Sequence, residues 1–214
     1  MKIAVLSEST ADEAAVSILI EGLLKTNVEI VRFPEPPSRG WRGVLTAVEL
    51  VLRHLHYRTD ADALVVTLDS DESPVHRKEH EGAGNDDPKC RLCQLQRIIT
   101  TVQSSLKPRR GCGPIRVAIG IAVPAIEAWC LCGTDAHITE SAWIQALQSH
   151  RFPYAKRDLK QRLYGSPDPV LKLETERLVE QARNLLAREQ LQMLENCFPI
   201  GFGSLAVEVR SWAS

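Results

Sequence analysis

The chain has 214 residues, of which 44% are hydrophobic and 25% charged, a composition typical of a folded globular protein. Its formal net charge of -1 excludes binding of nucleic acid through overall positive charge, so any such contact needs a local basic surface. The first residues are too polar for a signal peptide, and no apolar run reaches the length of a membrane helix. We therefore expect a cytoplasmic protein with no membrane partner, whose six cysteines are free or bind metal.

The N-terminal segment begins with a predicted strand and a predicted helix. Residues 2–6 (KIAVL) are apolar and bounded by a polar turn, which indicates a buried strand. Residues 12–25 carry apolar side chains at helical spacing, and we expect Thr10 or Asp12 to be the N-cap of this helix. A second strand is predicted over residues 28–33 (VEIVRF), which a proline-rich segment ends.

The next part of the chain continues this alternation. Residues 44–56 form a second predicted helix with apolar side chains on one side. Residues 63–68 (ALVVTL) are continuously apolar and rich in β-branched side chains, as expected of a strand buried on both faces. A polar loop over residues 72–89 leads to a predicted helix over residues 90–106, and residues 115–121 (IRVAIGI) indicate a fourth strand.

Strands that alternate with helices at this spacing predict an α/β fold with a Rossmann-like parallel sheet covered by helices. From residue 126 onward the pattern is mainly helical, and residues 171–194 are expected to form one long amphipathic helix. No internal repeat or low-complexity linker divides the sequence. We expect one domain over residues 1–214, with a core of about residues 1–135 and a helical C-terminal extension of about residues 136–214.

Carboxylates directly follow two of the predicted strands. Glu8 comes after the first strand, and Asp69 and Asp71 follow the most apolar one. Ligands of open parallel sheets gather where the strands end, and alternate residues of an extended segment point the same way. Hard divalent cations such as Mg²⁺ or Mn²⁺ prefer oxygen ligands, so the three side chains together predict a metal site. Each motif taken alone fits equally well a residue that caps a turn or a helix.

A second group of metal-ligand residues lies downstream, in and after the predicted polar loop. His76 and His80 are four residues apart, and Cys90 and Cys93 form a C-x-x-C pair. Two histidines and two cysteines match the ligand set of a structural Zn²⁺ site. The alternative is two exposed histidines and two helix cysteines that never meet.

Basic residues cluster between residues 151 and 162, with tyrosines interleaved. Such a group can contact a phosphate backbone, which makes it the best candidate for binding nucleic acid. The alternative is an ordinary solvated helix face. The candidate contacts are Lys156, Arg157, Lys160 and Arg162.

Three segments together resemble the motifs of a known family. Residues 8–12 (ESTAD) are similar to E-G-x-x-E/D, residues 69–71 (DSD) to D-x-D, and residues 124–129 (PAIEAW) to P-x-I-E-x-W. Their order resembles the Toprim domain of topoisomerases, primases and OLD-type nucleases. It resembles more closely a Toprim-like family of uncharacterised or phage-defence proteins related to RloB, and the resemblance extends to residues 154–160.

The resemblance implies a Toprim-like fold and phosphoryl transfer on DNA or RNA. Glu8 would be the general acid/base or a metal ligand, Asp69 and Asp71 would bind the metal, and Asp12 would support them. Glu127 would lie close to this catalytic group. Bound Mg²⁺ or Mn²⁺ would polarise the phosphate while Glu8 exchanges a proton. The family also implies an anti-phage defence effector that acts beside an ATPase subunit.

One departure from the family pattern is Ser9, which stands where the family usually has glycine. If that turn requires a positive φ, serine costs conformational energy there. Ser9 and the near-neutral net charge favour an alternative, a non-catalytic metal- or nucleotide-binding module of a larger complex. A third reading is a phosphotransferase or phosphatase that forms an aspartyl-phosphate on Asp69. No tyrosine lies in a supporting motif, so a hydrolytic nuclease is preferred over a topoisomerase. A homodimer is the candidate assembly of the chain.

Overall fold

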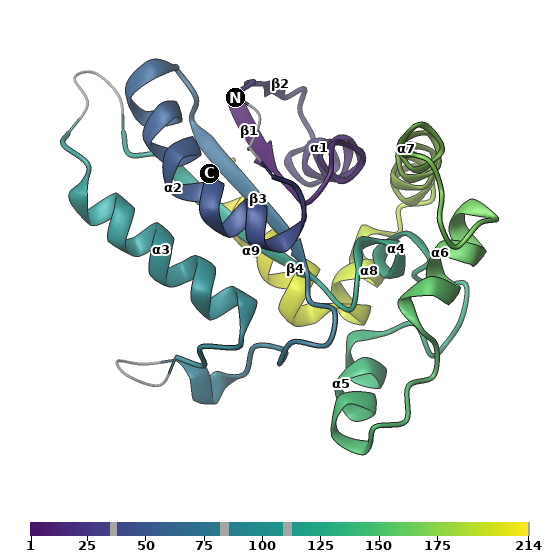
Figure 1. Cartoon of the computed structure of the whole chain (residues 1–214). Coiled ribbons are helices and arrows are strands. Elements are labelled where there is room, and N and C mark those ends of the chain that lie inside the picture. The colour runs from purple at the N-terminus through teal and green to yellow at the C-terminus, as the bar shows by residue number, and fades with distance from the viewer. Residues whose placement is uncertain (35–37, 82–85, 109–112, 214) are drawn as a thin grey trace.

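The computed structural model describes residues 1–34, 38–81, 86–108 and 113–213. Within these ranges a four-stranded, fully parallel sheet has the strand order β2-β1-β3-β4 (Figure 1). This confirms the predicted α/β fold with a helix-covered parallel sheet. The strands are β1 (Lys2–Leu6), β2 (Glu29–Ile30), β3 (Ala63–Asp69) and β4 (Arg116–Ala122).

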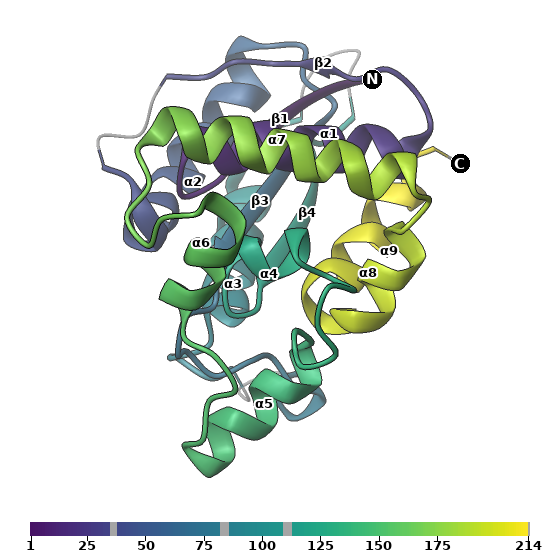
Figure 2. The same cartoon turned by 90° about the vertical axis from the view of Figure 1, so that its right-hand side faces the viewer.

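Helices cover both faces of the sheet. On one face α2 packs against β1 and β3, and α3 packs against β4 and α2. On the other face lie α1 and α9, with α7 on the outer side of α1 (Figure 2). The helices are α1 (Thr10–Leu24), α2 (Gly40–Arg58), α3 (Arg91–Ser105), α4 (Ile126–Cys130), α5 (Glu140–Ser149), α6 (Lys156–Tyr164), α7 (Leu171–Ala187), α8 (Leu191–Cys197) and α9 (Ser204–Ser211), with the short turns η1 (Lys78–His80) and η2 (Pro199–Gly203).

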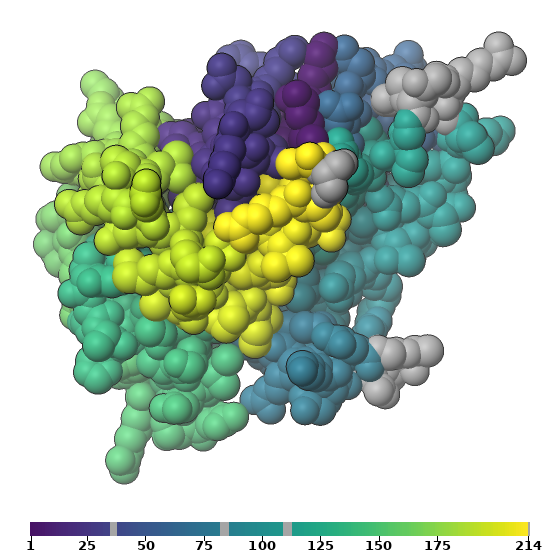
Figure 3. Space-filling model, turned by 180° about the vertical axis from the view of Figure 1, so that it is seen from behind, coloured from purple at the N-terminus to yellow at the C-terminus, as the bar shows by residue number. Residues whose placement is uncertain are grey.

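The buried core lies between the sheet and these two helical layers. Residues 63–68 of β3 are all buried, because β3 has a strand on each side and helices on each face. The close approach of α7 to α1 depends on Gly22, where a Cβ atom would lie 2.2 Å from Cδ2 of Leu186. In the space-filling view from behind, the C-terminal helices (yellow) lie between α7 and the teal segment that contains α3 (Figure 3).

The structure differs from the sequence prediction at three places. The second strand, β2, has only two residues, and both are exposed at the sheet edge. The predicted span 28–33 was therefore too long. The predicted helix over 171–194 is two helices, because Glu189 has a φ of 55° and the amide of Gln190 returns to the carbonyl of Leu185. The N-cap of α1 is Ser9 instead of Thr10 or Asp12.

The remaining strands and helices of the first half are observed with shifts of a few residues at their ends. In the described parts of the chain, no helix combines the length and the apolar character that crossing a membrane requires.

Candidate functional site

Five carboxylates gather at the C-terminal edge of the sheet, and we call them the acidic cluster. Parallel strands end at the same edge, so the residues that follow β1, β3 and β4 meet there although they are far apart in sequence. The backbone amide of Asp69 donates a 2.9 Å hydrogen bond to Oε1 of Glu8, which joins the ends of β1 and β3. The cluster consists of Glu8, Asp12 in the first turn of α1, Asp69 and Asp71 at the end of β3, and Glu127 in α4.

The turn between β1 and α1, which carries Glu8 and Asp12, is set by local backbone geometry. Ser9 has a φ of -142° and a ψ of 161°, which is extended backbone, and its hydroxyl accepts a hydrogen bond from the amide of Asp12. The turn after Glu8 therefore does not need glycine, and serine there stabilises the start of α1. The predicted energetic cost of Ser9 is wrong for this structure, because that cost applies only to positive φ.

Burial and mutual repulsion shift the ionisation of most of the cluster. Burial, together with the charge of Asp69, raises the pKa of Glu8 to about 7. Burial also raises the pKa of Asp12 well above its ordinary value, again with the charge of Asp69 as the next cause. The pKa values of Asp69 and Glu127 are raised by burial in the same way. Ionisation of all these carboxyl groups at once is therefore unfavourable unless a cation compensates their charge.

A lysine from α6 lies between two of these carboxylates. Nζ of Lys156 donates to Oδ2 of Asp69 at 2.5 Å and to Oδ1 of Asp71 at 2.8 Å. Burial disfavours the ammonium, but the charges of Asp69 and Asp71 outweigh it and raise the pKa of Lys156. Asp69 and Asp71 therefore share one cation, as the D-x-D spacing suggested, and that cation is a side chain of the protein.

The sharing does not arise from the extended backbone that the sequence reading assumed. Asp71 has a φ of 48°, in the left-handed region, and its amide donates to the carbonyl of Pro124 at 2.8 Å. Ser70 between the two aspartates is fully buried, and its amide bonds to the carbonyl of Ala122. A sharp turn held by the segment after β4 therefore brings the two carboxylates to Lys156.

An arginine that sequence reasoning missed completes this side of the cluster. Nη2 of Arg91 lies 2.8 Å from Oδ2 of Asp71. Its Nη1 donates a hydrogen bond to the backbone carbonyl of Asp69 and lies 3.9 Å from Oε1 of Glu8. The guanidinium also stacks on Trp41, 4.6 Å from the ring centre. Although burial opposes it, hydrogen bonds from Lys156 and Arg91 hold the pKa of Asp71 below its ordinary value. Nothing in a linear motif marks Arg91, since its partners come from other elements.

Glu127 has a separate set of partners on the helical side of the cluster. Its Oε1 accepts a 3.2 Å hydrogen bond from the hydroxyl of Tyr164 and lies 3.8 Å from Nζ of Lys160. Lys160 also pairs with Glu174 at 3.1 Å. Oε2 of Glu127 is buried and has no hydrogen-bond partner among the residues that the structure describes. One oxygen of this carboxylate is therefore available for a ligand.

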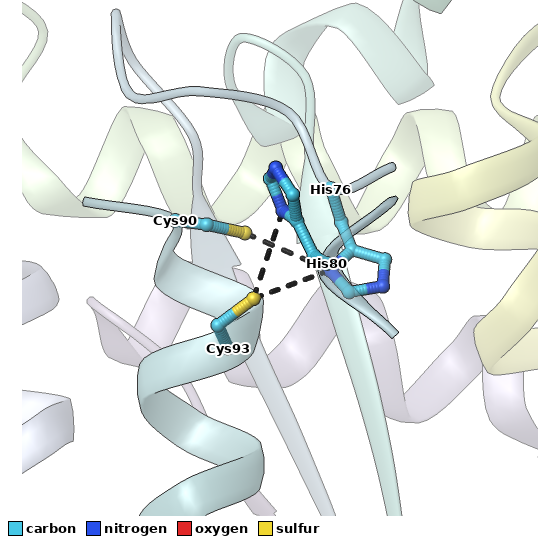
Figure 4. Close-up of side chains that lie close together, drawn as sticks. All are labelled: His76, His80, Cys90 and Cys93. Carbon is cyan, nitrogen blue, oxygen red and sulfur yellow. Dashed lines mark hydrogen bonds between the residues drawn. The ribbon is translucent and has the colours of Figure 1, made fainter. Parts of the chain in front are cut away.

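The predicted histidines and cysteines come together, and we call them the His/Cys centre (Figure 4). Their ligand atoms all lie within 4.8 Å of one another. Sγ of Cys93 is 3.4 Å from Nδ1 of His76 and 3.7 Å from Nδ1 of His80, and Sγ of Cys90 is 3.8 Å from Nδ1 of His76. The alternative in which the four residues never meet is wrong. This centre can hold a metal ion.

The predicted nucleic-acid contacts have different surroundings. Lys156 and Lys160 point toward the acidic cluster, and Arg162 pairs with Asp135 at 2.8 Å. Arg157 has a side chain that is 73% exposed and lies 3.7 Å from Asp168. In the described structure the four residues thus do not form one free basic surface.

Three comparisons with known proteins, against family models, curated proteins and solved structures, find no match for this chain. The Toprim-like resemblance therefore stays a prediction that the motifs alone support.

Proposed function

We propose that the protein is a metal-dependent nuclease that hydrolyses phosphodiester bonds in DNA or RNA with Mg²⁺ or Mn²⁺ at the acidic cluster. The observation that carries the proposal is the convergence of five carboxylates from three separate segments at one sheet edge. Desolvated carboxylates that repel one another are unfavourable unless a cation compensates them. The charges of Arg91 and Lys156 mainly compensate those of Asp69 and Asp71. Among the described residues, no ion pair joins Asp12 to a cation.

Asp12, Asp69 and Asp71 are the residues that would hold the divalent cation, with Glu8 as a further ligand or as the general acid/base, because their carboxylate oxygens meet at one sheet edge and oxygen ligands suit hard cations. When bound, the cation supplies Lewis-acid activation of the phosphate. Glu8, with a pKa near 7, is suited to take a proton from a water molecule or to return it to the leaving group. Lys156 would offset the negative charge that develops on the phosphate.

The alternative function, a non-catalytic metal- or nucleotide-binding module, is favoured by one observation. Lys156 and Arg91 already pair with Asp71, so part of the charge of the cluster is compensated within the chain itself. In that case a divalent cation would be a ligand or would not bind, and no bond would be cleaved.

Cleavage of a mixed panel of DNA and RNA substrates with Mg²⁺ or Mn²⁺ separates these functions. We expect metal-dependent cleavage by the wild type and a loss of at least about 100-fold in Asp69→Asn and in Glu8→Gln. Asp168→Asn, at a side chain that is 88% exposed, is the matched control and should retain full activity. Activity that survives in both cluster variants would reveal a contaminant and refute the nuclease.

The same preparations test the remaining alternatives. Binding of Mn²⁺ without cleavage of any substrate would support the binding module, and phosphate trapped on Asp69 would identify a phosphotransferase. The family resemblance also leads us to propose an ATPase subunit as partner, and cleavage that requires added ATPase would support it.

We also propose that the His/Cys centre binds Zn²⁺ in a structural role. Its two thiols and two imidazoles supply the four ligands that Zn²⁺ takes in tetrahedral sites. Nε2 of His80 lies 3.9 Å from Oδ2 of Asp87, so the ring has an outer carboxylate partner on the side away from the centre. A groove of about 520 Å³ between α3 and α9 is lined by His76 and gives the ion a path of entry.

Metal analysis of the purified protein tests the zinc assignment. We expect one Zn²⁺ per chain in the wild type, and its loss in Cys93→Ser and His76→Ala, whereas His137→Ala at an exposed site should retain it. Substitution with Co²⁺ should give the absorption spectrum of tetrahedral thiolate coordination. A wild type that takes up no Zn²⁺ or Co²⁺ would refute the site.

A further inference from the structure

The first turn of α3 contributes side chains to both centres. Cys90 is the N-cap of this helix, Arg91 is its first residue, and Cys93 lies in the same turn. Successive residues of a helix point about 100° apart, so the cysteines at i and i+3 face one side and Arg91 faces another. The cysteines therefore reach the histidines, while the guanidinium of Arg91 reaches Asp71 and the carbonyl of Asp69.

The first turn of α3 has no side-chain cap, although its residues are buried. Cys90 makes no side-chain capping hydrogen bond, and no acidic residue occupies the first turn of α3. The first amides of a helix lack partners within the helix, so without a cap the position of this turn depends on its packing and on the side chains that its residues contact. A metal ion bound by Cys90 and Cys93 would tie the turn to His76 and His80, which lie on the segment that follows Asp71.

Arg91 is 7% exposed and has no other carboxylate partner among the described residues than those of the acidic cluster. Its position therefore depends on the backbone between the two cysteines as well as on Trp41. If the turn moves, the guanidinium leaves Asp71, and the cluster loses a positive charge.

We propose that a metal ion in the His/Cys centre positions Arg91 at the acidic cluster and thereby sets the affinity of the cluster for divalent cations. The metal ion fixes the position of Arg91, and the charge of Arg91 in turn changes the affinity of the acidic cluster for a cation. The inference rests on the zinc site proposed above but not on nuclease activity, so its tests measure binding and the state of Arg91 instead of cleavage.

The first test follows the guanidinium directly in the full chain by ¹⁵N NMR. The Nε–H signal of Arg91, assigned by its absence in Arg91→Lys, should be sharp and protected in the zinc-loaded protein and should broaden when a chelator removes zinc. The signal of Arg157, which is exposed, is the internal control. A protected Arg91 signal that is unchanged in folded, zinc-free protein would overturn the proposal.

The second test does not require a stable zinc-free protein. Binding at two coupled sites is reciprocal, so Mg²⁺ at the acidic cluster must change the affinity for Zn²⁺ by the same factor as Zn²⁺ changes the affinity for Mg²⁺. We expect saturating Mg²⁺ to weaken zinc retention by about threefold to tenfold in competition with a zinc-selective chelator, because the positive charge of Arg91 disfavours a second cation. Arg91→Met should abolish this dependence, and Arg157→Met should preserve it.

The outcomes distinguish the proposals from one another. If the chain binds no zinc, both the zinc site and this inference fail. If zinc binds but neither the Arg91 signal nor the Mg²⁺ dependence responds, the zinc site is purely structural and only this inference fails. Loss of the coupling in Arg91→Met would support the inference even in a protein that cleaves no nucleic acid.

Discussion

At the scale of single residues, Lys156 has the most unusual position. Its ammonium lies between Asp69 and Asp71, where a bound cation would compensate the same two charges. The sequence reading assigned Lys156 to a nucleic-acid contact, and the structure shows its side chain 35% exposed and directed into the acidic cluster. A divalent cation and this ammonium therefore compete for the charge of the same carboxylates.

Replacing Lys156 by methionine keeps the length of the side chain and removes its charge. We expect the metal-free protein to lose on the order of 2 kcal/mol of unfolding free energy, because the partly buried carboxylates are left without their cation. Mg²⁺ should recover more stability in the variant than in the wild type, because the competing charge is gone. Urea unfolding with and without Mg²⁺ measures both effects.

The matched control is Arg157→Met, the neighbouring cation with a mostly exposed side chain, which should change stability by no more than about 0.5 kcal/mol. Equal effects of Mg²⁺ on Lys156→Met and on the wild type would contradict the competition.

Ser9 gives a second prediction at this scale, because it caps α1 from an extended backbone. Ser9→Ala should lose about 1 kcal/mol of unfolding free energy, whereas Ser9→Gly, which restores the family pattern, should lose only a few tenths. Thermal or urea unfolding ranks the three proteins. A glycine variant that is clearly more stable than the wild type would show that the turn is strained after all.

At the scale of elements, the contact between η2 and β4 determines how the C-terminal helices meet the sheet. A Cβ atom on Gly201 would lie 2.1 Å from the backbone carbonyl oxygen of Ile121, so η2 packs directly on the strand. Glu140 of α5 accepts hydrogen bonds from the amides of Ile200 and Gly201 at 2.7 and 2.9 Å. Three segments, α5, η2 and β4, are thus joined at one point.

Gly201→Ala should destabilise the protein by about 3 kcal/mol or more, because the backbone of η2 must move away from β4. Gly203 is the matched control, since its nearest neighbour to an added Cβ is at 3.4 Å and its φ is -60°. Gly203→Ala should be neutral or slightly stabilising. Unfolding curves of the two variants check the prediction, and similar losses in both would refute it.

At the scale of the whole molecule, buried carboxyl groups with raised pKa values should dominate the dependence of stability on pH. Burial raises the pKa of Glu140 and of Glu8 to about 7, and it also raises the pKa values of Asp12, Asp69 and Glu127. Between pH 4.5 and pH 7 the folded chain then binds more protons than the unfolded chain. This contribution to stability is fully present below the unfolded pKa and is lost as the pH rises through the folded pKa.

We therefore expect the metal-free protein to lose several kcal/mol of unfolding free energy between about pH 5 and pH 8, of which Glu140 accounts for about 3 kcal/mol. Glu140→Gln should reduce this slope, and Mg²⁺ should restore stability at pH 8 by binding the ionised cluster. Urea unfolding across this range measures the slope. Glu72→Gln, at an exposed site, controls for the loss of charge alone, and a flat or rising profile would contradict the prediction.

The sequence by itself determined the parallel sheet and the meeting of Glu8 with Asp69. Continuous apolar runs such as residues 63–68, separated by helical spacing, indicate buried parallel strands, and parallel strands bring their following residues to one edge. The histidines and cysteines were likewise marked by their spacing alone. In each case the signal is local, because backbone preference and burial are set by neighbouring residues.

The tertiary structure alone decided which cations enter the acidic cluster and where α7 ends. Lys156 and Asp71 are 85 positions apart, and Arg91 reaches Asp71 from a different helix, so no local pattern records either contact. Glu189 follows α7 in a left-handed conformation although it is not glycine, and the amide of Gln190 returns to the carbonyl of Leu185 there. The positions of Lys156 and Arg91 are set by long-range packing, because the free energy that fixes them comes from contacts between elements and not from the residues beside them in the chain.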